Sequence, residues 1–269
     1  MTARRLDAAR GLAPATISEA DGVRYLHLGT PWVQGAMRIR KSLALELEYI
    51  QRMMVWMLLR PTEELTRGRA VQLGLGAGAI TRFCHSTLRM RCTAVELNPS
   101  VIDACRLWFH LPNDSARFDV LNIDALDFVS DVSRADSVEV LCVDLYDHDA
   151  ASPVLDSAAF YRGCHGVLAD GGVMTVNLFG RDASFERSAG RIAAAFGEAQ
   201  VWSLRPTKEG NTVVVALKGV GAMPERATLA LRADNIECRF KLPAKKWLRM
   251  IRPLARAAIE AETPRHPSA

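Results

Sequence analysis

Short apolar runs alternate with longer segments whose apolar residues recur at helical spacing along most of the chain. The helical segments that this spacing predicts are Ala79–Leu88, Pro99–Phe109, Ala125–Val129, Ser157–Leu168 and Ser184–Phe196. The apolar, β-prone runs predict strands at Ala70–Leu75, Cys92–Glu96, Arg117–Leu121, Val138–Asp144 and Val173–Asn177. Strands that alternate with helices in this way predict crossover units, and hence a mainly parallel sheet covered by helices on both faces.

Two further strands, near Gln200–Leu204 and Thr212–Leu217, end the sheet differently. The segment that joins them, Pro206 to Gly210, is too short for a crossover, so the two strands are expected to form an antiparallel hairpin. Five parallel strands followed by such a hairpin predict an α/β fold with the Rossmann-like sheet typical of methyltransferases and their relatives.

The first 60 residues follow another pattern. Residues 1–20 predict a poorly structured arm, and Val23–Ile39, interrupted by glycine and proline, predicts a small β hairpin layer. Ser42 is placed to cap a helix whose apolar positions continue up to Pro61. We therefore expect three parts: residues 1–60 with the arm, the β layer and a linking helix, residues 61–220 with the Rossmann-like domain, and residues 221–269 as a basic helical tail.

Composition fits an ordinary globular protein, with 49% hydrophobic and 24% charged residues. The longest strongly apolar run, Met53–Leu59, is far shorter than the roughly 20 residues that a membrane span needs, and no secretory signal is seen. Six scattered cysteines without a Cys-x-x-Cys pair predict reduced thiols in a cytoplasmic protein, with no disulfide framework and no metal site.

The net charge of +4 is unevenly placed, because no acidic residue lies between Glu237 and Glu260. A basic amphipathic tail of this kind can contact nucleic acid or a membrane surface, but a solvated helix face that covers the edge of the sheet is the more common case. We favour the second interpretation, with neither nucleic acid nor membrane as partner. The basic residues are Arg239, Lys241, Lys245, Lys246, Arg249, Arg252 and Arg256.

A glycine-rich loop follows the first predicted parallel strand and precedes a helix, which is the context of a nucleotide-binding loop. Gly74, Gly76 and Gly78 allow the backbone to turn tightly and to approach a ligand without a Cβ atom in the way. Their spacing is Gly-x-Gly-x-Gly, which differs from the Gly-x-Gly-x-x-Gly of dinucleotide-binding enzymes. A nicotinamide dehydrogenase is therefore disfavoured.

Two acidic residues strengthen the case for adenosine binding. Glu96 ends the second strand, where a carboxylate can accept hydrogen bonds from both ribose hydroxyls. Asp124 follows the third strand, where it can accept from an adenine amino group or cap the next helix. The fourth strand leads to Asp144 and Asp147, an acidic loop that would attract a cationic amine or a sulfonium.

In this order the motifs resemble those of the spermidine synthases, a family of polyamine aminopropyltransferases, over about residues 25–217. The resemblance lies in the glycine loop, Val95-Glu-Leu-Asn98, Ile123-Asp-Ala125, the Asp-x-x-Asp loop, Phe160-Tyr161, Leu168-Ala-Asp-Gly-Gly172, Gly29–Gln34, and Glu46 with Tyr49. It implies an enzyme that transfers an aminopropyl group from decarboxylated S-adenosylmethionine to a di- or polyamine such as putrescine, releases methylthioadenosine, needs no metal and forms a homodimer.

The resemblance also implies roles for individual residues. Asp144 would be the base that anchors the attacking amine, since such an amine has a pKa of about 10.4 and must lose a proton before it attacks. Asp147 and Tyr49 would position the amine, and Gln34 would contact the adenosyl cofactor. For Asp147 a plain turn residue, and for Tyr49 a plain core aromatic, are the alternatives.

Four departures from the family pattern concern the substrate half of the site. Ala77 stands where typical members carry an aspartate that holds the aminopropyl end, Gln51 replaces a glutamate, His148 replaces a proline, and the N-terminal β layer is shorter. The loss of one acid leaves open whether the cofactor is decarboxylated S-adenosylmethionine or S-adenosylmethionine itself. A methyltransferase and a non-catalytic relative therefore stay as alternatives.

Overall fold

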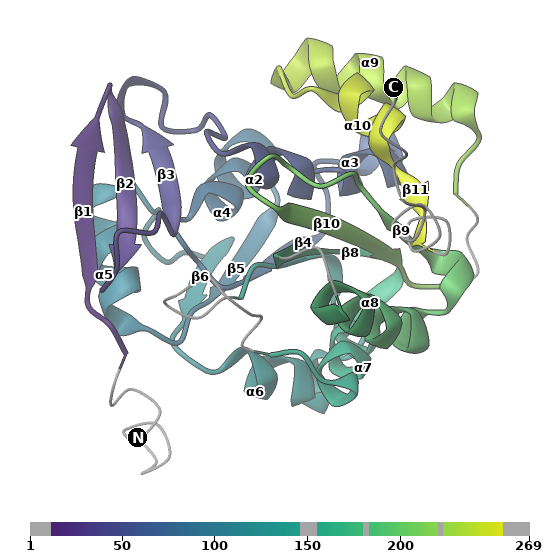
Figure 1. The fold of residues 1–269 in the computed structure, drawn as a ribbon, viewed down its shortest axis with the longest axis horizontal. Helices are drawn as coiled ribbons and strands as arrows, with labels where there is room; N and C mark the ends of the chain where they lie inside the picture. Colours follow the sequence, from purple (N-terminus) through teal and green to yellow (C-terminus); the bar gives the residue numbers. More distant parts are fainter. Residues whose placement is uncertain (1–11, 146–154, 180–182, 220–222, 255–269) are drawn as a thin grey trace, which may run out of the picture.

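The computed structural model describes residues 12–145, 155–179, 183–219 and 223–254. Within them lies an eight-stranded sheet of order β11-β9-β10-β8-β7-β4-β5-β6 (Figure 1). The pairs among β4 to β8 are parallel, whereas β10 runs antiparallel to β8 and β9. This order confirms the predicted parallel sheet with an antiparallel hairpin at one side. The strands are β4 (Arg69–Leu73), β5 (Arg91–Val95), β6 (Phe118–Leu121), β7 (Val138–Val143), β8 (Leu168–Phe179), β9 (Val201–Ser203), β10 (Asn211–Leu217) and β11 (Arg252–Pro253).

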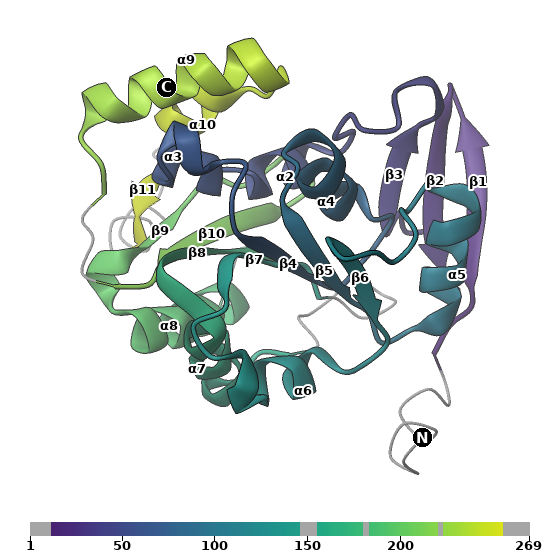
Figure 2. The same ribbon diagram turned by 180° about the vertical axis from the view of Figure 1, so that it is seen from behind.

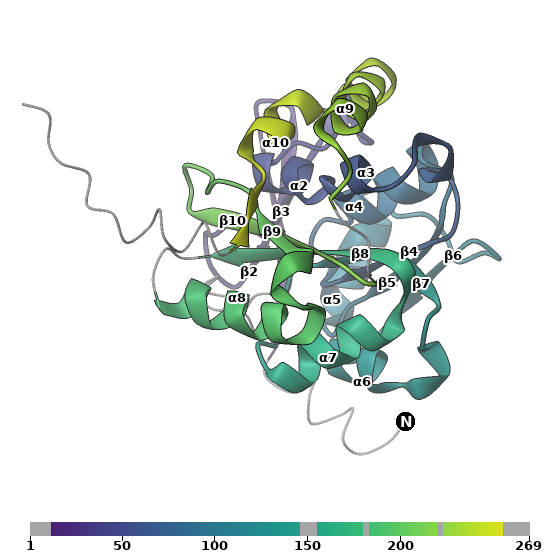
Figure 3. The same cartoon turned by 90° about the vertical axis from the view of Figure 1, so that its right-hand side faces the viewer.

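Helices cover both faces of the sheet, as Figure 3 shows from the side. One face carries α6 (Ala125–Ser130), α7 (Ala158–Val167) and α8 (Ala183–Phe196), and the other carries α4 (Ala79–Arg82), which continues into a π-helical turn, Phe83–Thr87. Alternation along β10 sends Val213 and Val215 into one core cluster and Val214 and Ala216 into the other. Both faces of the strand are therefore buried, which explains its continuous apolar sequence. The other helical segments of this region are α5 (Pro99–Trp108), Val132–Arg134 and Glu198–Gln200.

A second, three-stranded antiparallel sheet precedes the large one and consists of β1 (Ala15–Ala20), β2 (Val23–Leu28) and β3 (Gly35–Arg38). The small β layer is thus confirmed, but the prediction of an arm up to residue 20 was wrong, because β1 pairs with β2 along its whole length. Asp21 and Gly22 join the two strands with φ of 52° and 74°. An Asp-Gly pair suits such a two-residue turn, so the sequence did carry a signal for this hairpin.

The predicted helix that starts at Ser42 was also wrong. Ser42 ends a short 3-10 turn, Ile39–Lys41, and the first helix, α2, spans Glu48–Met53. A break at Met54 and Val55 separates it from α3 (Trp56–Leu59), which is followed by a 3-10 turn at Thr62–Glu64. Every residue from Met53 to Leu59 is buried, so tertiary packing, and not an amphipathic helical pattern, determines the conformation here.

The segment after the hairpin forms α9 (Arg226–Phe240) and α10 (Ala244–Met250), and then β11 pairs with β9 at the sheet edge (Figure 2). Ala233, Ile236 and Trp247 are fully buried in the core that lies on the α2 and α3 face. The strand β11 of the basic segment therefore covers the sheet edge, where we expected a solvated helix face, and the two helices pack on the core. No helix of the described residues is long and apolar enough to cross a membrane. All six cysteines are free, and five of them are buried.

Candidate active site

A cavity of about 890 Å³ lies at the carboxyl ends of the central strands, between the large sheet, the small sheet and α2. This is where open α/β sheets bind ligands, and its volume suits a ligand the size of a nucleoside derivative. Most of the residues that the sequence singled out line it together. They are Gln34, Tyr49, Gly74, Gly76, Glu96, Asp124 and Asp144. Asp147 and His148 lie outside the described residues.

The glycine loop is a close fit between its neighbours. Gly74 has φ of +83°, and a Cβ atom there would lie 2.1 Å from the carbonyl oxygen of Asp144. At Gly76, with φ of +50°, a Cβ atom would lie 3.0 Å from the carbonyl oxygen of Gln34. Gly78 has φ of +67° and precedes α4, and it is not among the described lining residues. Two of the three glycines therefore shape the cavity, and the third shapes the start of the helix.

Glu96 presents a carboxylate whose two oxygens are already oriented by the backbone. The amide of Leu75 donates to Oε2 at 2.9 Å, and the amide of Asn98 donates to Oε1 at 2.8 Å. Burial raises the pKa of Glu96, and these backbone hydrogen bonds oppose the rise. Each carboxylate oxygen has a second lone pair, so the two oxygens can still accept hydrogen bonds from two adjacent hydroxyls.

Asp124 caps a helix, which is one of the two roles that the sequence allowed, and it also lies in the cavity wall. Its Oδ1 accepts a hydrogen bond of 2.8 Å from the amide of Leu126 and so caps α6, and the residue also lines the cavity. Because Oδ1 serves the cap, Oδ2 is the oxygen that a ligand's amino group would reach.

Asp144 lies at the end of β7 with a hydrogen bond on each carboxylate oxygen. The hydroxyl of Tyr49 donates to Oδ2 at 3.3 Å, and Nδ2 of Asn177 donates to Oδ1 at 2.9 Å. Asn177 in turn accepts a hydrogen bond of 3.1 Å from Nδ2 of Asn211. Burial raises the pKa of Asp144 to about 6, against the opposing effect of Asn177 and Tyr49.

Sequence reasoning missed Asn177 and Asn211, which both line the cavity. Asn177 was assigned only as the last residue of a predicted strand. A polar residue at the carboxyl end of an otherwise apolar parallel strand was the available signal, because such ends face the ligand. Asn211 is the first residue of β10, the second strand of the antiparallel hairpin. Its contact with Asn177 follows from the pairing of β10 with β8, which the sequence alone does not reveal.

The departures from the family pattern have structural correlates. Ala77 is buried, and its Cβ would lie 2.6 Å from a Cβ atom on Gly35, so the two backbones pack closely. Gln51 donates to the carbonyl of Leu45 at 2.7 Å and thus supports the turn before α2. Glu46, which belongs to the resemblance and not to the departures, lines the cavity and accepts two hydrogen bonds of 2.9 and 2.5 Å from Arg38.

Solved structures with the same fold come from two kinds of enzyme. A probable spermidine synthase from Corynebacterium glutamicum has a TM-score of 0.71 at 16% identity, with 95% of this chain and 93% of that chain covered. Human methyltransferase-like protein 13, solved in complex with SAH, has a TM-score of 0.61 at 21% identity, with 77% and 95% covered. The fold is therefore the Rossmann-like fold that spermidine synthases share with methyltransferases.

In the sequence comparison, relatives of the first kind match over most of the chain, whereas methyltransferases match over smaller parts of it. A polyamine aminopropyltransferase of Neisseria meningitidis serogroup A is 31% identical over 247 residues, which span 91% of this chain and 92% of that protein. No protein-family model matches the chain. At this identity and coverage the chain belongs to the polyamine aminopropyltransferase family.

Proposed function

We propose that this chain is an aminopropyltransferase that moves an aminopropyl group from decarboxylated S-adenosylmethionine to a di- or polyamine such as putrescine. The observation that carries the proposal is the carboxylate of Asp144, held by Tyr49 and Asn177 at the wall of a cavity that is also lined by Glu96 and Asp124. A base and an adenosine-binding set in one cavity are what this reaction requires.

The adenosyl end of the cavity supports this substrate. Glu96 offers two oriented oxygens for the ribose hydroxyls, and Asp124 offers one oxygen for the adenine amino group. Gly74 and Gly76 line the cavity, and a side chain at either position would meet a neighbouring carbonyl oxygen, so glycine lets the loop take this path along the cavity wall. Gln34, which also lines the cavity, would contact the same substrate.

Asp144 supplies the proton acceptor at the reacting end. Its pKa of about 6 leaves the carboxylate ionised at neutral pH, where it can anchor the ammonium group of the acceptor and take up its proton. The freed nitrogen forms a bond to the carbon beside the sulfonium while the carbon–sulfur bond breaks. Methylthioadenosine leaves as a neutral thioether, so the protein needs no general acid.

Alignment of the two reactants contributes the rest of the rate. Tyr49 fixes one carboxylate oxygen of Asp144 and lines the cavity beside it, which suits a residue that positions the amine. A role for Asp147 in positioning stays a prediction, because that residue lies outside the described part of the chain. The homodimer and the cytoplasmic location likewise stay predictions.

Methyl transfer from S-adenosylmethionine is the second candidate, and Ala77 is the observation that favours it. The family resemblance places an aspartate there to hold the aminopropyl end, whereas this chain has a buried methyl group packed on Gly35. The fold and the adenosine contacts would serve either reaction.

The nucleoside product distinguishes the candidates. The purified protein would be incubated with decarboxylated S-adenosylmethionine or S-adenosylmethionine and a series of amines, and the nucleoside identified by mass spectrometry. We expect methylthioadenosine with the decarboxylated compound. S-adenosylhomocysteine would support methyl transfer, and no turnover together with no binding of either compound would exclude both reactions.

The variant Asp144→Asn tests the base. We expect it to lower the rate of transfer about 100-fold or more, because general bases contribute this much, while affinity for the adenosyl compound changes less than about twofold. Asp103→Asn, on the exposed surface of α5, is the matched control and should keep full activity. Full activity in Asp144→Asn would refute the assignment.

A further inference from the structure

The carboxylate of Asp144 is held from two sides by separate parts of the chain. Tyr49, which donates to Oδ2, belongs to α2, whereas Asn177, which donates to Oδ1, belongs to β8. Asn177 is itself held by Asn211, the first residue of β10. The orientation of the carboxylate therefore depends on how α2 is placed relative to the loop that leads into β10.

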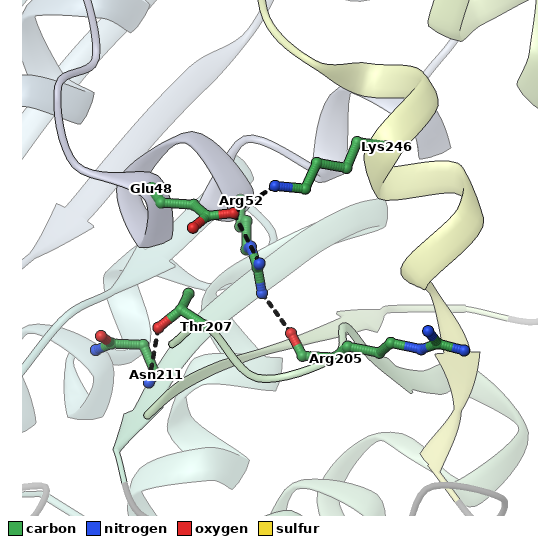
Figure 4. Close-up of polar contacts among 6 residues, drawn as sticks. All are labelled: Glu48, Arg52, Arg205, Thr207, Asn211 and Lys246. Carbon is green, nitrogen blue, oxygen red and sulfur yellow. Dashed lines mark hydrogen bonds and ion pairs between the residues drawn. The ribbon is translucent and has the colours of Figure 1, made fainter. Parts of the chain in front are cut away.

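Arg52 connects these two parts directly. It lies one helical turn after Glu48 on α2, and only 5% of its surface is exposed. Its Nη2 donates to Oε1 of Glu48 at 2.8 Å, and its Nη1 donates to the carbonyl oxygen of Arg205 (Figure 4). One guanidinium group thus joins the helix that carries Tyr49 to the loop that precedes Asn211.

The loop passes this restraint on to Asn211. The amide of Asn211 donates to the hydroxyl of Thr207 at 3.2 Å (Figure 4). In the other direction, the amide of Thr207 donates to the carbonyl of Asn211 at 2.8 Å. Thr207 is 2% exposed, so the turn is packed as well as hydrogen bonded. Because the turn is closed in this way, fixing the carbonyl of Arg205 also fixes where β10 begins.

A second cation reaches the carboxylate partner of Arg52 from the C-terminal helices. Nζ of Lys246 on α10 donates to the same Oε1 of Glu48 at 2.7 Å (Figure 4). Lys246 and Arg52 together lower the pKa of Glu48, so this carboxylate stays ionised and keeps its hold on the guanidinium. Glu48 therefore keeps a cationic partner when Arg52 is replaced, so the substitution leaves no uncompensated carboxylate.

We propose that Arg52 is a positioning residue, which holds Tyr49 and Asn211 in the relative arrangement that orients the carboxylate of Asp144. The inference rests on the proposed function in one respect, namely that Asp144 is the base. Arg52 reaches the reaction only through other residues, and it is not among the described residues that line the cavity.

Arg52→Met is the test variant, because methionine keeps an apolar stem and removes both hydrogen bonds. Arg60→Met is the matched control: Arg60 is 6% exposed, lies at the end of α3, and has a glutamate partner four residues later, Glu64, at 3.6 Å. Both arginines also have an Nε without a hydrogen bond among the described residues. The two substitutions therefore remove similar groups, one connected to the site and one not.

We expect Arg52→Met to lower kcat at least tenfold, with KM for the adenosyl substrate changed less than about twofold. Carbon-13 NMR of the Asp144 carboxyl group gives a second readout that needs no turnover. Weaker hydrogen bonds from Tyr49 and Asn177 should raise the pKa of Asp144, since both bonds lower it. Arg60→Met should leave kcat and the titration as in the wild type.

Equal kcat and equal titration in Arg52→Met and Arg60→Met would overturn the inference, as would a titration of Asp144 at lower pH in Arg52→Met. If Arg52→Met does not fold, Arg52→Lys replaces it. A lysine ammonium keeps the charge but lacks the planar fork that reaches both acceptors, so intermediate losses are expected. A wild-type protein without aminopropyl transfer would refute the proposed function, and the NMR titration would still decide the role of Arg52.

Discussion

The pKa values of two carboxyl groups in the cavity are determined by the same competition between burial and hydrogen bonding. Burial raises the pKa of Glu96 and of Asp144, and the donors around each group oppose the rise. Glu96 is held by backbone amides, which a mutation cannot easily remove, whereas Asp144 is held by the side chains of Tyr49 and Asn177. The reactivity of Asp144 is therefore the property that substitutions can adjust.

The pH dependence of turnover follows from this residue. Asp144 must be ionised to act as a base, and burial raises its pKa to about 6. We expect kcat/KM for the acceptor amine to fall as the pH drops through about 6, with a slope of one proton, because this ratio reports the ionisation of the free protein. The measurement is kcat/KM at limiting amine between about pH 3.5 and 8.5. An acid limb centred near pH 4, where an exposed aspartate titrates, would contradict the assignment.

Stability should respond in the opposite direction. Because the folded-state pKa of Asp144 lies above the value of about 3.8 for an unperturbed aspartate, the folded protein binds this proton more tightly than the unfolded chain. Ionisation of Asp144 therefore destabilises the fold, and this cost is absent below about pH 4. Asp144→Asn should be more stable than the wild type at pH 8 by up to about 3 kcal/mol.

Urea unfolding of both proteins at pH 8 and pH 4 measures this difference. The two unfolding free energies should converge at the lower pH. A variant that is less stable than the wild type at pH 8 would show that the hydrogen bonds of the carboxylate outweigh its desolvation.

At the residue scale, the sequence predicted a site residue wherever the residue type and its position after a strand together indicate one kind of chemistry. Glu96, Asp124 and Asp144 could be named in advance because the carboxyl ends of parallel strands meet at one edge of the sheet. Asn211 could not, since its role depends on which strand lies beside β8, and the pairing of distant strands leaves no local pattern.

At the scale of elements, regular alternation of strands and helices predicted the parallel sheet, and burial explains where prediction failed. The segment Met53–Leu59 is apolar throughout, so it carries no periodicity that could reveal the break between α2 and α3. Glu48, the first residue of α2, makes its ion pairs with Arg52 and with Lys246 of a distant helix. The start of α2 is therefore coupled to tertiary contacts that a local pattern does not contain.

The docking of α10 gives a prediction at this scale. Trp247 is fully buried in the core on the α2 and α3 face. Trp247→Ala should lower the free energy of unfolding by about 3–5 kcal/mol, since the lost contacts leave a cavity. Leu231→Ala, on α9 and 72% exposed, is the control and should change it by less than about 0.5 kcal/mol. Urea unfolding monitored by circular dichroism checks both, and equal losses would contradict the packing of α10.

At the scale of the whole molecule, the large sheet is shared by two cores, and the cavity opens where the small sheet meets it. The small sheet touches the glycine loop that follows β4 at Gly35 and Ala77, where neither backbone leaves room for more atoms. Binding of a ligand in the cavity therefore depends on the contact between Gly35 and Ala77, which is closely packed before any ligand binds. The family shares the fold with methyltransferases, so the difference in chemistry must lie in the residues that line this opening.

The positions of the cysteines allow thiol modification to measure how often buried parts of the chain open transiently. Five thiols are buried, and burial raises the pKa of each of them, for Cys92 and Cys142 to about 12. Cys238, on the outer side of α9, is exposed. A thiol reagent should therefore modify Cys238 of the native protein quickly. The rate at which each buried cysteine is modified afterwards would measure how often the strand or helix that carries it becomes transiently exposed.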